Sequence, residues 1–304
     1  MNKKSVDTPA NGKKNLIILI ILVVAGLAAL YFRVNPKWKA ADLKIETTRV
    51  DYKIQYVNSE GMTLETRITP PDGYSRVKVE SGSFAEYLRK YSLHPVNINL
   101  PVYNGKTLNT DSPAIFDISL GKEGYQQCAD SIIRLYSDYF YENEQFDKIS
   151  FEFSNGDICD YNRWRNGKRM LALGSFSCEI PAALPDDSLQ GYRNYLKTVM
   201  NYAGTLSLLN ESEPISPDEI RIGDIICNEY HVVLIVDEAV NKNGEKVYLI
   251  GQSFIPAVCF HIVTRYEGGV TTPWFTQEQL EQQGFVIDSV EFSKNDIRRW
   301  KDGF

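Results

Sequence analysis

The sequence places a cysteine and a histidine where each could take part in thiol chemistry. Gln126-Gln127-Cys128 opens a segment with the apolar spacing of a helix, and His231 begins an intensely apolar strand over residues 232–236. A helix N-terminus lowers the pKa of a cysteine, and an imidazole can accept the thiol proton. This pair predicts a thiol hydrolase with Cys128 as nucleophile and His231 as general base.

A predicted amphipathic helix carries the cysteine in its first or second turn. Two glycines lie just upstream, so the helix is expected to begin between residues 122 and 126. Cys128 shares a face with residues that follow a 3.6-residue period: Ala129, Ile132, Ile133, Leu135, Tyr136, Tyr139 and Phe140. The Cys128 N–H and the Gln127 side chain could hold an oxyanion, with Gln126 as the alternative amide donor. The competing interpretation of Cys128 is a small buried hydrophobe.

A third group is needed to orient the imidazole. Asp237 lies on the predicted face of His231, but six residues of strand at about 3.3 Å each put it roughly 20 Å away. If the chain turns back so that Val236 pairs with Val247, His231 lies opposite Gln252. Gln252 is therefore the predicted orienting residue, although a tight turn at the intervening Asn-Gly pair would change this register. The alternative is that the histidine only caps the edge of the sheet.

Other candidate site residues carry weaker signals. Tyr161 and Trp164 could line a cleft and stack on sugar or peptide, or they could be a packed strand end before a turn. His261 could replace His231, but its neighbours are typical of a buried strand. The sequence contains no Gly-x-Ser-x-Gly, HExxH or phosphate-binding glycine loop.

The N-terminal segment predicts a membrane anchor. Residues 1–14 are polar and contain four lysines, and residues 16–32 are apolar and uncharged. At about 1.5 Å per residue the apolar run gives roughly 25 Å of helix, enough for a thin bilayer. We expect a cytoplasmic lysine-containing tail over residues 1–14, an uncleaved span over residues 15–32, a juxtamembrane stalk over 33–58 and an extracytoplasmic α+β domain over 59–304. A cleaved signal peptide is the alternative.

Composition limits the classes of partner and cofactor. The formal net charge is -6 and no basic block follows the N-terminal segment, which argues against nucleic acid as a partner. The five cysteines have no CxxC or Cys/His metal spacing, so we expect mostly free, buried thiols and no metal or other cofactor. A two-residue turn at Asn166-Gly167 would place Cys159 opposite Gly174, so a disulfide between Cys159 and Cys178 would need another register.

Hydrophobic periodicity predicts an α+β fold with helices packed on a mostly antiparallel sheet. Besides the helix that carries Cys128, helices are expected over residues 83–91 and 188–206. Strands are expected over residues 62–79, 95–119, 148–180 as a hairpin around Asn166-Gly167, 225–236, 246–254 and 258–266.

The arrangement of these motifs resembles the papain-like NlpC/P60 and CHAP peptidases and amidases. The resemblance lies in Gln127-Cys128 on a helix, a Gly223-Asp224-Ile225 lead-in, the strand headed by His231, and a polar residue on the next strand. It implies a papain-like core and a substrate among peptidoglycan peptides. It also implies the roles of nucleophile for Cys128, base for His231 and orienting group for Gln252. The interval between Cys128 and His231 is longer than is usual in those enzymes.

The body of the chain also resembles a bacterial envelope family described as domain of unknown function 4846, which implies an exported location but no reaction. The matching segments are Pro71-Asp72-Gly73-Tyr74, Gly82-Ser83-Phe84, Gln126-Gln127-Cys128-Ala129-Asp130, Asp160-Tyr161-Asn162-Arg163-Trp164, Tyr202-Ala203-Gly204-Thr205-Leu206 and Gln252-Ser253-Phe254-Ile255-Pro256-Ala257. The chain departs from the family at Cys227-Asn228-Glu229-Tyr230, where a glycine-rich approach to His231 is expected. A bulky Tyr230 there could narrow access to the imidazole.

These observations lead to one expected function and two alternatives. The expected protein is a membrane-anchored, extracytoplasmic cysteine hydrolase that acts on cell-wall peptide bonds. Its substrate-binding residues are expected to be Tyr161, Trp164, Tyr230 and Ser253. The first alternative is a non-catalytic domain on the same scaffold that binds envelope glycan or peptide. The second is a structural partner of other membrane proteins.

Overall fold

The computed structural model describes residues 54–173 and 176–301, which form an α+β body. Its centre is an antiparallel sheet of eight strands: β1 (Tyr74–Arg76), β8 (Ser212–Pro214), β9 (Ile225–Cys227), β10 (Val232–Asn241), β11 (Lys246–Gln252), β12 (His261–Ile262), β15 (Trp274–Thr276) and β18 (Ile297–Trp300). The main order is β12-β11-β10-β9-β18-β8, with β1 beside β10 and β15 beside β11. The predicted α+β class with a mostly antiparallel sheet is confirmed.

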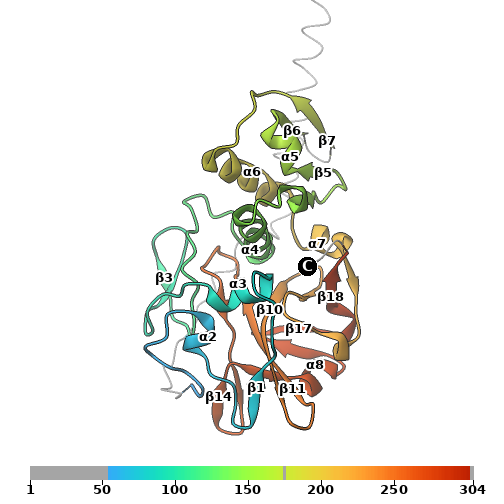
Figure 1. Cartoon of the computed structure of the whole chain (residues 1–304). Coiled ribbons are helices and arrows are strands. Elements are labelled where there is room, and N and C mark those ends of the chain that lie inside the picture. The colour runs from blue at the N-terminus through green and yellow to red at the C-terminus, as the bar shows by residue number, and fades with distance from the viewer. Residues whose placement is uncertain (1–53, 174–175, 302–304) are drawn as a thin grey trace, which may run out of the picture. The chain divides into compact units, whose positions relative to one another are not determined.

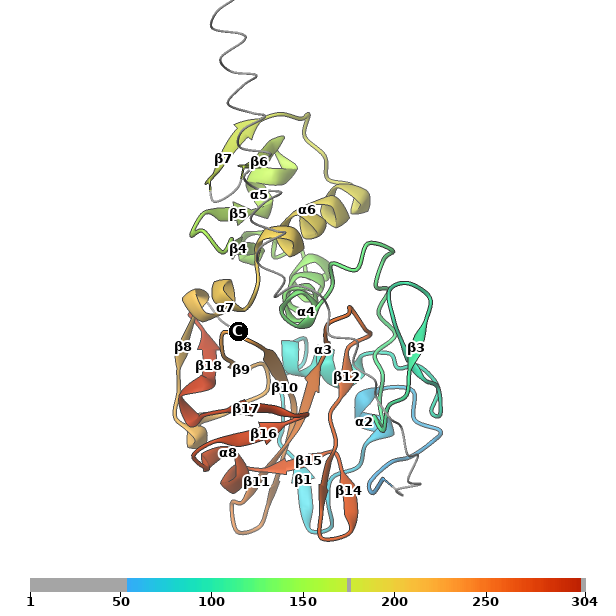
Figure 2. The same cartoon turned by 180° about the vertical axis from the view of Figure 1, so that it is seen from behind.

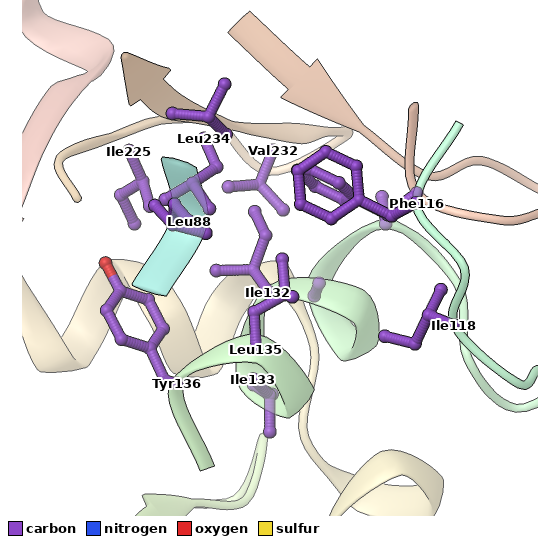
Figure 3. Packing of buried hydrophobic residues seen from close by; sticks show 14 of the residues in the cluster. Leu88, Phe116, Ile118, Ile132, Ile133, Leu135, Tyr136, Ile225, Val232 and Leu234 are labelled. Carbon is purple, nitrogen blue, oxygen red and sulfur yellow. The ribbon is translucent and has the colours of Figure 1, made fainter. Parts of the chain in front are cut away.

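Helix α4 (Cys128–Glu142) packs on one face of this sheet. Figure 3 shows Ile132 of α4 facing Val232 and Leu234 of β10, and all three belong to one buried cluster. Figures 1 and 2 show the sheet on one side of α4 and a smaller group of strands and helices on its other side. The opposite face of the sheet carries a second buried cluster, which includes Val233 and Phe292.

Strands β10 and β11 form a hairpin that contains a β-bulge. Ile235 pairs with Ile250, but Asp237 pairs with Leu249, so Val236 is an extra residue. Because side chains alternate along a strand, one extra residue exchanges the two faces beyond it. The prediction that Asp237 shares a face with the histidine is therefore wrong.

Asp237 has a structural role on the other face. It is fully buried and accepts hydrogen bonds from Arg76 Nε at 2.6 Å and Arg89 Nε at 2.8 Å. Arg76 comes from β1, and Arg89 comes from α3 (Phe84–Lys90). The buried ion pairs join these two elements to the middle of β10.

On the histidine side of the bulge, the register differs from the prediction by one side-chain repeat. Leu234 pairs with Gly251, whereas the predicted register gave it Leu249. A shift by two residues leaves each side chain on its predicted face. His231 and Gln252 are therefore still expected to share a face.

The predicted hairpin over residues 148–180 is wrong. The segment instead contains β4 (Ser150–Glu152), β5 (Ile158–Asp160), α5 (Tyr161–Arg165), β6 (Lys168–Leu173) and β7 (Phe176–Pro181). Asp160 caps α5, since its side chain accepts from the Arg163 N–H at 2.8 Å. The cap starts a helix where the pattern predicted a continuous strand, and Cys159 pairs with Phe151 in the β4–β5 hairpin.

Two further segments depart from their predicted boundaries. Residues 64–67, expected within a strand, form the short helix α2 (Leu64–Arg67), where Arg67 Nε donates to the Gly61 carbonyl at 2.7 Å. The helix expected over residues 188–206 ends at Tyr202 because the backbone of Ala203 and Gly204 is extended. It becomes α6 (Leu189–Tyr202) and α7 (Thr205–Glu211).

The remaining elements are short. The helix expected over residues 83–91 is confirmed as α3, with Ser83 accepting from the Glu86 N–H. The others are β2 (Leu100–Pro101), β3 (Thr107–Leu108), β13 (Arg265–Glu267), β14 (Val270–Thr272), α8 (Gln277–Glu281), β16 (Phe285–Ile287), β17 (Val290–Phe292) and three 3-10 turns at Phe146–Lys148, Pro217–Glu219 and Lys294–Asp296.

The predicted tail, membrane span and most of the stalk lie outside the described residues. Within residues 54–173 and 176–301, no helix has the length and apolar character needed to cross a bilayer.

Candidate functional site

Helix α4 begins at the cysteine. Gln127 is its N-cap residue, and its backbone N–H donates to Asp130 Oδ2 at 3.0 Å. Cys128 is therefore the first helical residue, which confirms its predicted place in the first turns, although the helix begins two residues or more after the predicted start at 122–126. At this position its backbone N–H lies in the first turn, where N–H groups have no partner within the helix.

Cys128 is buried, with 7% of its surface exposed. Burial raises the pKa of the Cys128 thiol to about 11, and nearby Asp130 acts in the same direction. The backbone N–H groups of Ala129 and Val232 act against this rise. The sulfur thus lies beside the amide that follows His231 and remains a neutral thiol at neutral pH.

The turn between β9 and β10 holds His231 through Asn228. Asn228 Oδ1 accepts from the backbone N–H groups of Tyr230 and His231, both at 2.9 Å, and the Asn228 N–H donates to the His231 carbonyl at 3.0 Å. Asn228 Nδ2 donates to the Glu291 carbonyl at 3.1 Å, which joins the turn to β17. This side-chain turn fixes the backbone of the histidine.

The predicted contact between His231 and Gln252 is present. Their Nε2 and Oε1 atoms are 2.8 Å apart, and both residues are buried. The imidazole lies beside the rings of Phe254 and Phe292, with centroids at 5.1 and 6.3 Å. Burial lowers the pKa of His231, whereas the hydrogen bond to Gln252 and the charge of Asp288 oppose the decrease. A neutral imidazole is therefore favoured at neutral pH.

The thiol and the imidazole both lie at the start of β10, and they contact different neighbours. The sulfur lies near the Val232 N–H, and the Val232 side chain belongs to the cluster that contains α4. The His231 ring instead lies against Phe292 of the second cluster. The structure thus brings His231 to Gln252 and Cys128 to the adjacent backbone amide. Among the described residues, no hydrogen bond joins the sulfur to the imidazole.

Three buried polar atoms near the start of α4 have no hydrogen-bond partner among the described residues. They are Gln126 Nε2, Asp130 Oδ1 and Ser131 Oγ. Gln126 is held by its other amide atom, because Oε1 accepts from Arg134 Nη1 at 2.6 Å. Burial raises the pKa of Asp130 to about 8, although the N–H of Gln127 partly opposes the rise. The start of α4 therefore contains buried hydrogen-bonding atoms that no described residue pairs with.

The predicted substrate-binding residues lie in different environments. Tyr161 and Trp164 are buried with Tyr195, and Trp164 Nε1 donates to the Gly191 carbonyl at 3.2 Å. Ser253 is fully buried and donates to the Val258 carbonyl at 2.6 Å. Only Tyr230 presents its ring to solvent, with 77% exposed.

A cavity of about 570 Å³ lies next to the histidine turn. Its walls include Asn228, Tyr230, Ser289 and Phe292, which places it between the β9–β10 turn and the β16–β17 hairpin. Cys128 and His231 are not among its lining residues. A ligand in this cavity would contact Tyr230, the residue directly before His231.

The second candidate histidine is held by a different contact. His261 is buried, and its Nδ1 lies 3.0 Å from the Cys259 carbonyl oxygen. Burial lowers the pKa of His261, and the bond to this carbonyl opposes the decrease. This side-chain contact is to a residue just before β12 and does not involve Cys128 or His231.

Sequence reasoning missed two polar residues at the site, Asn228 and Asp288. Asn228 lies three residues before the histidine, a spacing at which an asparagine can form a side-chain turn. Asp288 is followed by Ser289 between two alternating segments, which is a recognisable turn signal. Its contact with Gln252 Nε2, at 2.5 Å, depends on tertiary structure that no local pattern carries.

No metal site or disulfide emerges from the described residues. No group of three or more histidine, cysteine or acidic side chains there could hold a metal ion. All five cysteines are free, and four are buried, as expected from their spacing.

Comparisons with known proteins identify one family. A family model described as "Domain of unknown function (4846)" matches residues 64–299, which is more than half of the chain. No curated protein and no solved structure matches the chain.

Proposed function

Because this chain belongs to the family of domain of unknown function 4846, whose description assigns no reaction, we propose an activity from the site itself. In this proposal, the protein is a membrane-anchored, extracytoplasmic cysteine hydrolase with a papain-like core that cleaves peptide bonds of the cell wall. One observation carries the proposal. His231 Nε2 is bonded to Gln252 Oε1 at 2.8 Å, which leaves Nδ1 for a thiol.

The proposed reaction follows from the neutral state of both groups. His231 Nδ1 accepts the Cys128 proton as the sulfur attacks the substrate carbonyl carbon. The Cys128 N–H and a side-chain amide of Gln127 hold the oxyanion, and unpaired Gln126 Nε2 is a further donor near the helix start. The imidazolium then returns the proton to the leaving amine as the C–N bond breaks. Water hydrolyses the thioester with the imidazole again acting as base.

A specific observation favours a second candidate function, a non-catalytic domain that binds envelope glycan or peptide. Cys128 is 7% exposed, and burial raises its pKa to about 11. The cavity of about 570 Å³ is lined by exposed Tyr230 and polar side chains but not by Cys128. A ligand could bind there without meeting the thiol.

Hydrolysis of purified peptidoglycan distinguishes the two functions. The full-length protein is incubated with peptidoglycan, and released fragments are identified by mass spectrometry. The hydrolase proposal predicts new amino termini with the wild type and a loss of at least about 10³-fold in rate with Cys128→Ala. Pull-down of peptidoglycan without fragment release, unchanged by Cys128→Ala, would support the binding function and reject the hydrolase.

A neighbouring cysteine supplies the matched control. Cys227 is buried, and its thiolate would interact with that of Cys128, so the two lie in one region. Cys227→Ala removes the same atoms from that region without removing the proposed nucleophile. The hydrolase proposal therefore predicts retained activity in Cys227→Ala, whereas equal losses in both variants would indicate a packing effect.

A further inference from the structure

A chain of two hydrogen bonds leads from the imidazole to the surface. His231 Nε2 and Gln252 Oε1 are 2.8 Å apart, and Gln252 Nε2 donates to Asp288 Oδ2 at 2.5 Å. His231 and Gln252 are buried, whereas Asp288 is exposed. The exposed carboxylate thus contacts the buried amide from the side opposite to the imidazole.

Asp288 determines which way the Gln252 amide faces. A carboxylate only accepts hydrogen bonds, so the amide NH₂ must face Asp288 and the amide oxygen must face the ring. An oxygen that only accepts then requires a proton on His231 Nε2. We propose that Asp288 is a positioning residue that fixes His231 in the Nε2–H tautomer and leaves a lone pair on Nδ1.

The backbone at Asp288 supports a role for its side chain. Asp288 and Ser289 form the two-residue turn between β16 and β17, with Ile287 paired to Val290. Their φ angles are 44° and 70°, in the left-handed region that favours glycine. Serine at such an angle costs about 1 kcal/mol or more, whereas aspartate tolerates this region well. The turn therefore presents the carboxylate from a position that suits aspartate.

The same hairpin contacts the ring at a second point. Phe292 of β17 lies beside the imidazole, and the Glu291 carbonyl accepts from Asn228, which holds the histidine backbone. The β16–β17 hairpin thus fixes the ring, its amide partner and its turn together. This convergence explains how one short hairpin can set the orientation of His231.

The catalytic meaning of this inference rests on the proposed function. A thiol can transfer its proton only to a ring nitrogen that has a free lone pair. With Nε2 protonated, Nδ1 is that nitrogen. The reversed tautomer would present an N–H to the thiol and could not act as its base.

Nitrogen-15 NMR of the histidine rings tests the proposal directly. The chain has three histidines, His94, His231 and His261, so the ring signals can be assigned by substitution. At a pH where the rings are neutral, His231 is expected as Nε2–H. His261 is expected as the opposite tautomer, because its Nδ1 faces the Cys259 carbonyl at 3.0 Å. An Nδ1–H signal from His231 in the wild type would overturn the proposal.

A matched pair of turn variants isolates the carboxylate. Asp288→Gly removes the carboxylate that accepts the hydrogen bond. Ser289→Gly makes the same change at the other turn residue with a positive φ angle but keeps the carboxylate. Asp288→Gly is expected to give a mixture of His231 tautomers, while Ser289→Gly keeps the Nε2–H form. His261 should keep its Nδ1–H tautomer in both variants, because its Cys259 partner is unchanged, and this reports an intact fold. A single Nε2–H tautomer in Asp288→Gly would reject the positioning role.

Kinetics separate this proposal from the proposed hydrolase. If the wild type releases peptidoglycan fragments, Asp288→Gly should lower kcat by about 10-fold or more with KM little changed. If the wild type releases none, the hydrolase is rejected, but the tautomer measurement still decides whether Asp288 positions the ring.

Discussion

The two sides of the β10 strand start differ in how their polar groups are satisfied. On the histidine side, His231, Gln252 and Asp288 form a continuous chain of hydrogen bonds. On the cysteine side, Gln126 Nε2, Asp130 Oδ1 and Ser131 Oγ are buried without a partner among the described residues. One side is organised by the protein alone, and the other retains unused hydrogen-bonding capacity.

The difference indicates separate tasks for the two sides. A chain of satisfied groups holds an imidazole in one orientation and costs little to maintain. Unpaired buried groups cost about 1–3 kcal/mol each, a cost that a bound polar ligand can offset. The cysteine side therefore carries a desolvation cost that the histidine side does not, and each prediction below tests this contrast.

Thiol labelling should give the largest effect. Cys178 is the one cysteine that is half-exposed, whereas Cys128 is buried and its pKa is raised to about 11. Iodoacetamide at pH 7 should label Cys178 faster by about 100-fold or more, because little Cys128 thiolate is present. Labelling of Cys128 should rise as pH approaches 11, as measured by peptide mass spectrometry. Preferential labelling of Cys128 at pH 7 would instead mean that the cysteine side is open and activated.

Asp130→Asn should stabilise the protein at alkaline pH. Burial raises the pKa of Asp130 from 3.8 to about 8, so the folded state binds the proton more tightly than the unfolded state. Stability from this group is full below about pH 4 and declines as pH rises toward 8. Asparagine keeps an oxygen for the Gln127 N–H and cannot ionise. The variant should gain several kcal/mol, at most about 5, over the wild type at pH 9, measured by urea denaturation.

The pH dependence provides the control for this substitution. The gain of Asp130→Asn should shrink toward zero below about pH 4, where the wild-type carboxyl is protonated in both the folded and the unfolded state. A constant difference at every pH would mean that the substitution changes packing alone.

A matched pair of serines tests the contrast with the smallest expected effect. Ser131 and Ser253 are both fully buried, but only Ser253 Oγ has a partner, the Val258 carbonyl at 2.6 Å. Ser253→Ala should lose about 1 kcal/mol, whereas Ser131→Ala should be neutral or stabilising, since it removes an unpaired hydroxyl. Thermal unfolding of both variants measures this. Equal losses would show that the two hydroxyls are equally well satisfied.

The contact between His231 and Gln252 could be predicted from the sequence, but the exact strand pairing that produces it could not. His231 and Gln252 meet although the predicted pairing was off by two residues, because such a shift preserves the face of every side chain. The bulge at Val236 was not visible in the apolar pattern, so Asp237 was assigned to the wrong face. Alternation alone does not reveal an extra residue.

Contacts between distant segments could not be predicted. Asp288 reaches Gln252 from a separate hairpin, and only the tertiary fold brings them together. Tyr161 was read as a possible ligand contact because aromatic residues before a turn suit both roles. In the structure, the Asp160 cap starts α5 there, and Tyr161 packs against Tyr192 and Tyr195.

Because of the extra residue at Val236, the two ends of the β10–β11 hairpin have different pairing registers. The distal loop, where the Gly244 N–H bonds the Asn241 carbonyl, follows one pairing frame, and the end near His231 follows another. Lengthening or shortening the loop can therefore be absorbed at the irregular position without sliding Gln252 along the ring. Relatives of this chain should accordingly tolerate insertions in the distal loop while keeping the spacing between the irregularity and the histidine constant.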